Sequence, residues 1–252
     1  MLRVRVIPTL LLKNDGLVKG VQFQDHQYVG DPINAVKIFN EKEVDELVFI
    51  DICATENRNG PNFDLLKKIA SEAFMPFGYG GGVSNIEQIK HLFSIGIEKV
   101  IINSAAFYKP ELISEASKIS GSQSIVVSID VKRTLFGKYN VFVKNGKVNT
   151  KLDPVEYAKS MQELGAGELI VCNIANEGKR KGYDNVILKK IASAVDIPVV
   201  ASGGAGSLND FADAYHNGHA ASVSAGSMFV FYGRHNAVLI TYPKYKDLES
   251  LF

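Results

Sequence analysis

Short apolar runs alternate along the chain with stretches in which apolar residues recur at helical spacing. The helical stretches include PINAVKIFNEK, FDLLKKIASEAF, NIEQIKHLFSIG and NVILKKIASAV. Apolar residues three and four positions apart form one face of a helix, whereas a short continuous run is typical of a buried strand. The apolar runs, which we expect to be strands, cover residues 4–12, 47–50, 77–79, 100–102, 124–129, 169–172, 199–201 and 221–225.

This alternation of strand and helix predicts repeated βαβ units and therefore a parallel sheet. Eight such units within 252 residues is the size of a (β/α)₈ barrel, or TIM barrel. The alternative is an open, doubly wound sheet. That fold places a Gly-x-Gly-x-x-Gly turn after its first strand, and no such turn follows residues 4–12.

An internal repeat indicates how the barrel is built. Residues 31–107 align without a gap with residues 153–229, at a constant offset of 122, and 20 of the 77 pairs are identical. The segment LKKIAS at 66–71 recurs at 188–193. A period this long exceeds that of solenoid repeats. It predicts two duplicated half-barrels, at about residues 1–120 and 121–252, that close into a single domain spanning residues 1–252.

Two longer segments interrupt the pattern after the first and fifth strands. Residues 11–30 read as an irregular excursion with a turn at positions 14–16. Residues 139–150, YNVFVKNGKVNT, predict a β-hairpin, because Asn145-Gly146 is typical of a type I′ turn. Excursions that follow barrel strands lie at the C-terminal end of the barrel, where barrel active sites are built.

Composition excludes several classes of protein. The 28 Lys and Arg residues are balanced by 27 Asp and Glu, so the net charge gives no general attraction to nucleic acid or to membranes. Neither the cysteines, Cys53 and Cys172, nor the five histidines have metal-type spacing, so we expect no metal and no cofactor. No apolar stretch is long enough to span a membrane and the start lacks a signal-peptide pattern, so we expect a cytoplasmic protein.

Two glycine-rich segments follow the third and seventh strands, at equivalent places in the repeat. Glycines let the backbone approach an anion closely, and the helix that follows offers unpaired N–H groups. Two such phosphate cradles at one barrel end predict a ligand with a phosphate at each end; the alternative is that the glycines only form tight turns. The first cradle comprises Gly81, Gly82, Asn103 and Ser104, and the second comprises Gly178, Gly203, Gly204, Gly226 and Ser227.

The motifs VIPTLLLK, GYGGGVSNIEQIKHLFSIGIEKVIINSAAF, VVSIDVKR, IPVVASGGAGS and AGSMF resemble, in this order, the cyclase subunit of imidazole glycerol phosphate synthase, the HisF family. The resemblance covers nearly the whole chain. It implies a (β/α)₈ barrel at the cyclase step of histidine biosynthesis, with a bis-phosphorylated ribulosyl carboxamide nucleotide as substrate. It also implies that a glutaminase subunit of the HisH type docks at the N-terminal barrel end and supplies ammonia.

The resemblance implies a pair of catalytic aspartates at the ends of strands one and five. Asp130 in VVSIDVKR matches the second aspartate, but Leu11 in VIPTLLLK stands where the family has the first. Leucine can neither donate nor accept a proton. General acid–base help is worth roughly 10²–10⁴ in rate, so we expect the substitution to impair cyclase chemistry.

Further substrate contacts are implied by single matching positions. Lys19 matches a loop lysine that closes over substrate, and the alternative is a solvated side chain. Asp51 matches an aspartate that orients substrate hydroxyls, and the alternative is a helix or turn cap. The family's Asp-Gly pair after strand six is Glu177-Gly178 here, which keeps the glycine and lengthens the carboxylate side chain by one methylene.

Four charged residues at strand starts match the family's gate to an ammonia passage at the bottom of the barrel. They are Arg5, Glu46, Lys99 and Glu168. Strand alternation makes Arg5, Thr9 and Leu11 point the same way, so the gate and the upper site would share one interior. The alternative is that these are ordinary solvated charges.

Two functions are consistent with these residues. The first is a HisF-like subunit of a glutamine amidotransferase complex, which conducts ammonia and serves an ATP-dependent amidotransferase that amidinates a bacterial surface sugar. The second is the ordinary cyclase, forming imidazole glycerol phosphate and an aminoimidazole carboxamide ribotide, with Asp130 acting alone or together with Asp51 or Glu177. A structural partner without chemistry is a third possibility, and the retained cradles and gate argue against it.

Overall fold

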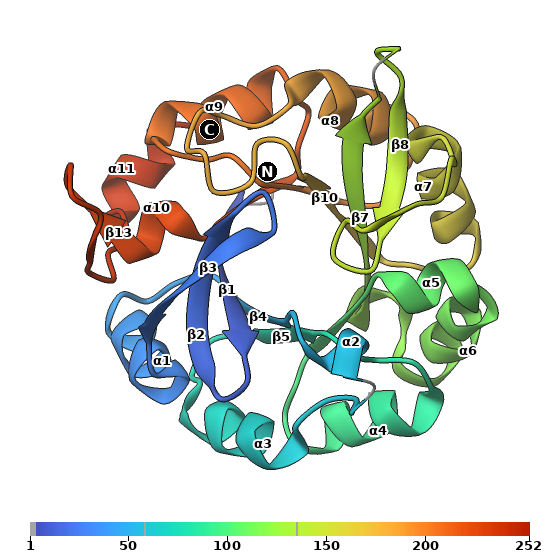
Figure 1. Ribbon diagram of the computed structural model, residues 1–252, viewed down its shortest axis with the longest axis horizontal. Coiled ribbons are helices and arrows are strands. Elements are labelled where there is room, and N and C mark those ends of the chain that lie inside the picture. Colours follow the sequence, from blue (N-terminus) through green and yellow to red (C-terminus); the bar gives the residue numbers. More distant parts are fainter. Residues whose placement is uncertain (1–3, 58, 135) are drawn as a thin grey trace.

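Eight parallel strands close into a barrel in the computed structural model, which describes residues 4–57, 59–134 and 136–252 (Figure 1). Each barrel strand pairs with the next along the chain, and the last pairs with the first. The predicted (β/α)₈ barrel is confirmed, and the open sheet is excluded. The barrel strands are β1 (Arg5–Lys13), β4 (Leu47–Asp51), β5 (Phe77–Gly80), β6 (Lys99–Ile102), β7 (Ile125–Arg133), β10 (Glu168–Asn173), β11 (Val199–Ser202) and β12 (Ser222–Ala225).

Helices cover the outside of the barrel, and their first residues repeat the offset seen in the sequence. The carboxylates of Asp31 and Asp153 accept hydrogen bonds from Asn34 N and Val155 N, both at 2.8 Å. These caps satisfy N–H groups that the first helical turn leaves unpaired. Helices α1, α3 and α4 begin 122 positions before α7, α8 and α9. The outer helices are α1 (Pro32–Glu41), α3 (Phe63–Glu72), α4 (Ile86–Ser94), α6 (Glu111–Ser120), α7 (Pro154–Glu163), α8 (Asn185–Ala192) and α9 (Leu208–His216).

Apolar side chains pack in two layers, one on each side of the strands. Along β1, Val6 and Leu10 face the outer helices, whereas Ile7 and Leu11 face the barrel interior. This alternation is the period of two expected of a strand. The inner layer is a column formed by Ile7, Val48, Ile101, Val126 and Val200, with Ile50 and Ile170 packed against it. The two barrel ends are therefore separated by an apolar interior.

Two antiparallel ribbons extend from the C-terminal end of the barrel. The prediction of an irregular excursion over residues 11–30 was wrong. The chain turns after β1 at Asn14, which has a φ of 54°. It then forms β2 (Gly16–Val21), which pairs antiparallel with β1, and β3 (Gln24–Gly30), which pairs antiparallel with β2. The hairpin expected over residues 139–150 is confirmed as β8 (Tyr139–Val143) and β9 (Val148–Asn149). Its turn residues Asn145 and Gly146 both have positive φ, as a type I′ turn requires.

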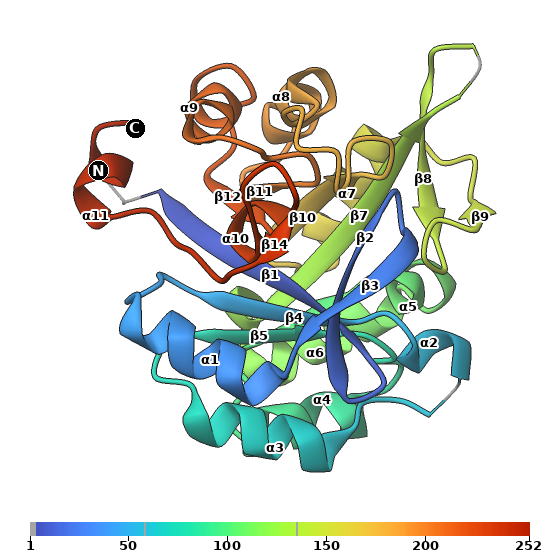
Figure 2. The same ribbon diagram turned by 60° about the vertical axis from the view of Figure 1, so that its left-hand side comes forward.

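The end of the chain returns to the N-terminal end of the barrel. After β12, α10 (Ser227–Val230) leads into a small hairpin of β13 (Phe231–Tyr232) and β14 (Ala237–Val238). The chain then runs down the outside to α11 (Tyr245–Glu249), which lies beside the start of β1 (Figure 2). Among the described residues, no helix combines the length and the apolar character needed to cross a membrane.

Candidate functional site

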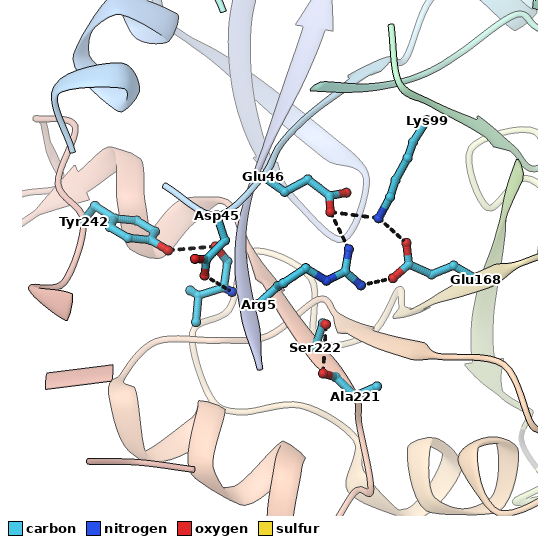
Figure 3. Close-up of polar contacts among 9 residues, drawn as sticks. Arg5, Asp45, Glu46, Lys99, Glu168, Ala221, Ser222 and Tyr242 are labelled. Carbon is cyan, nitrogen blue, oxygen red and sulfur yellow. Dashed lines mark hydrogen bonds and ion pairs between the residues drawn. The ribbon is translucent and has the colours of Figure 1, made fainter. Parts of the chain in front are cut away.

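The four predicted gate residues form a closed ring of ion pairs at the N-terminal end of the barrel (Figure 3). Arg5 pairs with both Glu46 and Glu168. The Nζ of Lys99 lies 2.8 Å from a Glu46 oxygen and 2.6 Å from a Glu168 oxygen. Each carboxylate therefore contacts both cations, and the two charge types alternate around the opening.

Burial distinguishes this ring from ordinary surface charges. Glu46 and Glu168 are only 3% and 4% exposed. Burial favours the neutral form of the Arg5 guanidinium, but attraction to Glu168 and Glu46 raises its pKa overall. Two carboxylates taken out of water need such compensation. The alternative of solvated charges at strand starts does not hold for these glutamates.

A cavity of about 720 Å³ opens at the opposite end, where the strands terminate. It extends down to Thr9 and to Ile101 and Ile170, at the top of the apolar column. Every residue that the sequence assigned to the upper site lines this one cavity. These residues are Leu11, Lys19, Asp51, Gly81, Gly82, Asn103, Ser104, Asp130, Glu177, Gly178, Gly203, Gly204, Gly226 and Ser227.

Asp130 is a buried carboxyl group near the end of β7, with 8% exposure. Burial, helped by repulsion from Glu177, raises its pKa to about 7. The amide nitrogen of Asn103 donates to its Oδ2 at 3.2 Å and to the carbonyl oxygen of Ser128 at 3.0 Å. A carboxyl group poised near neutral pH can both donate and accept a proton.

Leu11 faces the same cavity from β1. It pairs with Ile50 on β4 and with Val18 on β2, and its side chain is half-buried. An apolar residue therefore stands where the family resemblance implies the strand-one aspartate, the partner of Asp130 in proton transfer. Asp15, four residues along, lies in the turn between β1 and β2, away from this register.

The first cradle is covered by the hairpin of β8 and β9. Ser104, the first residue of α5 (Ser104–Tyr108), accepts a hydrogen bond from Lys144 N at 3.0 Å. The Asn145 amide donates to Ile52 O at 2.7 Å, and Lys147 pairs with Glu56. The N–H group of Gly82 donates to Thr55 Oγ1 at 3.3 Å, a long bond that a stronger acceptor could replace. The hairpin was predicted, but its closure over this cradle was not.

The second cradle holds a buried lysine. Gly204 has a φ of 126°, and a Cβ there would overlap the backbone of Gly182. A Cβ on Gly226 would overlap the Lys19 ammonium, which is 2% exposed and donates to Thr9 O at 2.8 Å. Burial lowers the pKa of Lys19, while the Glu177 and Cys172 side chains act to raise it. The solvated alternative for Lys19 was wrong, because β2 carries this residue into the barrel mouth.

Glu177 and Gly178 lie on the loop after β10, where the ribbon of β2 and β3 docks. Gln22 N donates to Glu177 O at 3.0 Å, and Gly178 has a φ of 74° with the Gly20 backbone against its Cα. A side chain at position 178 would push the ribbon away. Phe23 at the ribbon tip also approaches Gly146, so the two ribbons meet above the cavity. No local pattern along the chain signals this long-range contact.

Asp51 acts as a cap in this structure. Its Oδ1 accepts hydrogen bonds from Cys53 N at 2.8 Å and Ala54 N at 3.0 Å, at the start of α2 (Ala54–Asn57). Burial raises its pKa in spite of these two bonds. The carboxylate lines the cavity as well, so its proposed contact with substrate hydroxyls stays a prediction.

A hydrogen-bond network that the sequence did not reveal connects β7 and β8 to the two ends of the loop that carries Glu177. Asp184 Oδ2 accepts bonds from Tyr139 OH at 2.8 Å and Asn173 Nδ2 at 2.7 Å. Arg133 in turn donates to Tyr139 OH at 2.7 Å. The network ties the ribbon of β7 and β8 to the loop that carries Glu177. Within the described ranges, no group of three His, Cys, Asp or Glu side chains has a geometry that could hold a metal ion.

Comparisons with known proteins agree with this geometry. A family model described as "Histidine biosynthesis protein" matches residues 5–236. A Pseudomonas aeruginosa protein named "Putative imidazole glycerol phosphate synthase subunit hisF2" is 48% identical over 249 residues, covering 99% of each chain. A Leptospira interrogans protein named "Putative imidazole glycerol phosphate synthase subunit HisF" is 46% identical over 253 residues, covering 100% of each.

A relative whose name carries no qualifier is less similar. The Alkaliphilus metalliredigens protein named "Imidazole glycerol phosphate synthase subunit HisF" is 40% identical over 229 residues, covering 91% of each chain. Both the matched family model and these identities span most of the barrel. The chain therefore belongs to the HisF family of imidazole glycerol phosphate synthase subunits.

Proposed function

We propose that this chain is a HisF-like subunit of a glutamine amidotransferase complex whose original cyclase chemistry has been lost. A glutaminase docks at the N-terminal barrel end and releases ammonia into the interior. The ammonia leaves at the C-terminal end for an ATP-dependent amidotransferase, which converts an acetamido group on a bacterial surface sugar to an acetamidino group.

The observation that carries this proposal is the contrast between Leu11 and the ring. The ring of Arg5, Glu46, Lys99 and Glu168 is complete and paired. Leu11 faces Asp130's cavity from the position of the missing proton-transfer group. Losing a general acid–base group costs roughly 10²–10⁴ in rate, whereas an ammonia passage needs no carboxylate at that point.

The barrel interior supports passage of a small neutral molecule. Above the ring, the column of aliphatic side chains offers no charge that would favour ammonium over ammonia. Further up, Thr9 Oγ1 and Ser224 Oγ lie 2.6 Å apart and give a weakly polar position in the lining of the cavity. Ammonia moving along this route is shielded from bulk water by the ring below, which must rearrange to admit it.

The ordinary cyclase is a second candidate, favoured by one specific observation. Asp130 keeps its buried place, its bond from Asn103 and a pKa raised to about 7. Glu177 and Asp51 line the same cavity, so Asp130 has further carboxyl groups near it without any help from position 11. In this alternative, Glu177 provides the second proton transfer.

A cyclase assay separates the two candidates. Purified chain is supplied with the bis-phosphorylated ribulosyl carboxamide nucleotide and ammonium, and imidazole glycerol phosphate is measured. We expect turnover at least roughly 10² below that of an ordinary family member assayed in parallel, in line with the loss of one acid–base group. The chain should still stimulate glutamine hydrolysis by its glutaminase. Turnover at ordinary levels would instead establish the cyclase.

A further inference from the structure

A basic groove lies on the ribbon formed by β7, β8 and β9, apart from the cavity described above. Its volume is about 840 Å³. Four cationic side chains line it, and among the described residues no acidic side chain does so. We call it the ribbon groove, and its lining includes Lys132, Arg133, Phe136, Lys138, Phe142 and Lys151. All four cations are exposed, so a partner can reach them.

The segment that builds the groove concentrates the positive charge of the protein. Residues 131–152 contain five lysines and one arginine but no aspartate or glutamate, although the whole chain has a net charge of only +1. The remainder of the chain is therefore net negative. The nearest acids along the chain do not line the groove, because Asp130 lines the cavity and Asp153 caps α7. Neighbours in sequence thus leave the charge of the groove unbalanced.

The lysines of the groove are available to pair with a partner. Lys147 pairs with Glu56, but it lies outside the groove. Arg133 donates to Tyr139 OH at 2.7 Å, and that hydroxyl donates to Asp184, which offsets part of the Arg133 charge. Within the described ranges, no ion pair is formed by Lys132, Lys138 or Lys151. A partner surface that carries carboxylates would supply the missing negative charge.

An exposed aromatic residue lies among these charges. Phe136, at the tip of the ribbon, is 94% exposed, whereas Phe142 on β8 is half-buried. The tip is held in shape by hydrogen bonds from Thr134 N to Lys138 O at 2.7 Å and from Gly137 N to Thr134 O at 3.0 Å. Aromatic residues are enriched in protein interfaces because they bury a large area on binding. The groove therefore fits an acidic surface that also offers an apolar contact.

β7 connects the groove to the cavity. Asp130 lines the cavity, and Lys132, two residues further along the strand, lines the groove. Strand alternation places both side chains on the same face of β7. Figure 2 shows the ribbon of β7 and β8 projecting away from the barrel. A protein bound to the ribbon groove would therefore stand beside the mouth of the cavity, where the proposed function has ammonia leave.

We infer that the ribbon groove is the docking site of the amidotransferase that receives the ammonia, and that this enzyme binds it with an acidic surface. The inference rests on the proposed function, because that function places the amidotransferase at this barrel end. Nucleic acid is also negatively charged, but domains that bind it are basic as a whole, whereas this chain is nearly neutral. Docking beside the mouth lets ammonia pass to the bound enzyme before it mixes with solvent.

The first test measures how tightly the amidotransferase encoded beside this chain binds the complex of the chain and its glutaminase. We expect Lys132→Glu/Lys138→Glu and Lys138→Glu/Lys151→Glu each to weaken binding by at least roughly tenfold, because glutamates repel an acidic surface. Phe136→Ser should weaken it about threefold through the lost apolar contact. Wild-type affinity should fall as salt is raised, since exposed charges are screened.

The second test compares two sources of ammonia at a low concentration of the amidotransferase. With glutamine as the source, the groove variants should form less acetamidino product than wild type, because fewer complexes are assembled. With ammonium chloride as the source, wild type and variants should give equal rates, because free ammonium needs no docking. Stimulation of glutamine hydrolysis should match wild type in every variant, because the ring at the other end is unchanged.

Matched controls separate the groove from general effects of charge. Lys67→Glu/Lys68→Glu makes the same change of net charge at two exposed lysines on α3, which lies across the barrel from the ribbon (Figure 1). This variant should bind the amidotransferase as wild type does. Lys132→Arg/Lys138→Arg keeps the charge and should keep the affinity within about twofold.

The outcomes distinguish this inference from the proposed function. If the groove variants bind the amidotransferase as tightly as wild type does, the inference is overturned while the proposed function stands. Binding of a single-stranded oligonucleotide that is lost in the groove variants, with amidotransferase binding unchanged, would assign the groove to nucleic acid and also overturn the inference. If wild type stimulates the glutaminase but neither binds nor supplies the amidotransferase, both are overturned.

Discussion

The two ends of this barrel differ in how their buried charged side chains are paired. At the N-terminal end, four charged side chains from four elements are paired with one another in a ring that needs no ligand. At the C-terminal end, Lys19 and Asp130 are buried with neutral hydrogen-bond partners, and an apolar residue replaces an expected carboxylate. A self-paired ring suits a gate, whereas buried, incompletely paired charges suit a site that receives a charged ligand.

The largest expected effect is at the apolar residue of the C-terminal end. Leu11→Asp should raise ammonia-dependent imidazole glycerol phosphate formation by roughly 10²-fold or more, because it supplies a proton-transfer group facing Asp130's cavity. The matched control is Leu11→Asn, because asparagine is similar to aspartate in size and polarity but has no ionisable carboxyl group. An equal gain in both variants, or none in Leu11→Asp, would contradict this account of the missing chemistry.

The buried carboxyl group of Asp130 predicts a dependence of stability on pH. Its folded-state pKa of about 7 lies above the ordinary value of 3.8, so the folded state holds this proton more tightly than the unfolded state does. Stability is therefore lost as the pH rises from about 4 to about 7. At about 1.4 kcal/mol per pKa unit, the loss is at most about 4 kcal/mol.

Urea unfolding at a series of pH values checks this slope. Asp130→Asn removes the titrating group and should flatten the dependence, so that the variant is more stable than wild type at pH 8 and close to it at pH 4. Glu177→Gln serves as the comparison, because it removes a neighbouring negative charge but leaves Asp130 buried. A wild-type slope that survives in Asp130→Asn would assign the pH dependence to other groups.

At the N-terminal end the corresponding prediction concerns the ring. Glu168→Ala leaves Arg5 and Lys99 sharing one carboxylate, and removing one partner of a buried ion pair should cost about 3 kcal/mol of unfolding free energy. Glu156→Ala removes one partner of an exposed pair with Lys159 and should change the unfolding free energy little. Equal losses of unfolding free energy in the two variants would mean that the buried ion pairs of the ring stabilise the protein no more than an exposed pair does.

The same contrast separates what the sequence could predict from what it could not. Ring members were predictable because the resemblance implies a gate at four strand starts, and strand alternation makes Arg5 point into the same interior as Thr9 and Leu11. The burial of Lys19 was not, since it depends on β2 pairing back along β1 rather than leaving the barrel. The contact between Phe23 and Gly146 joins two ribbons more than a hundred residues apart, and no local pattern encodes it. Local periodicity therefore predicted the barrel, whereas the position of the two ribbons over its C-terminal end depends on tertiary packing.

The smallest expected effect decides the role of Asp51. If its carboxylate only caps α2, Asp51→Ala should cost about 1 kcal/mol of unfolding free energy, and Asp51→Asn should restore most of it, because an amide oxygen can accept the same bonds from Cys53 N and Ala54 N. Both variants would then bind the bis-phosphorylated nucleotide as wild type does in calorimetry. A carboxylate that orients substrate hydroxyls predicts a different pattern: Asp51→Asn keeps the stability but loses affinity, because the neutral amide is a weaker acceptor than the charged carboxylate. Measuring both quantities on both variants therefore separates a role in folding from a role in binding at this residue.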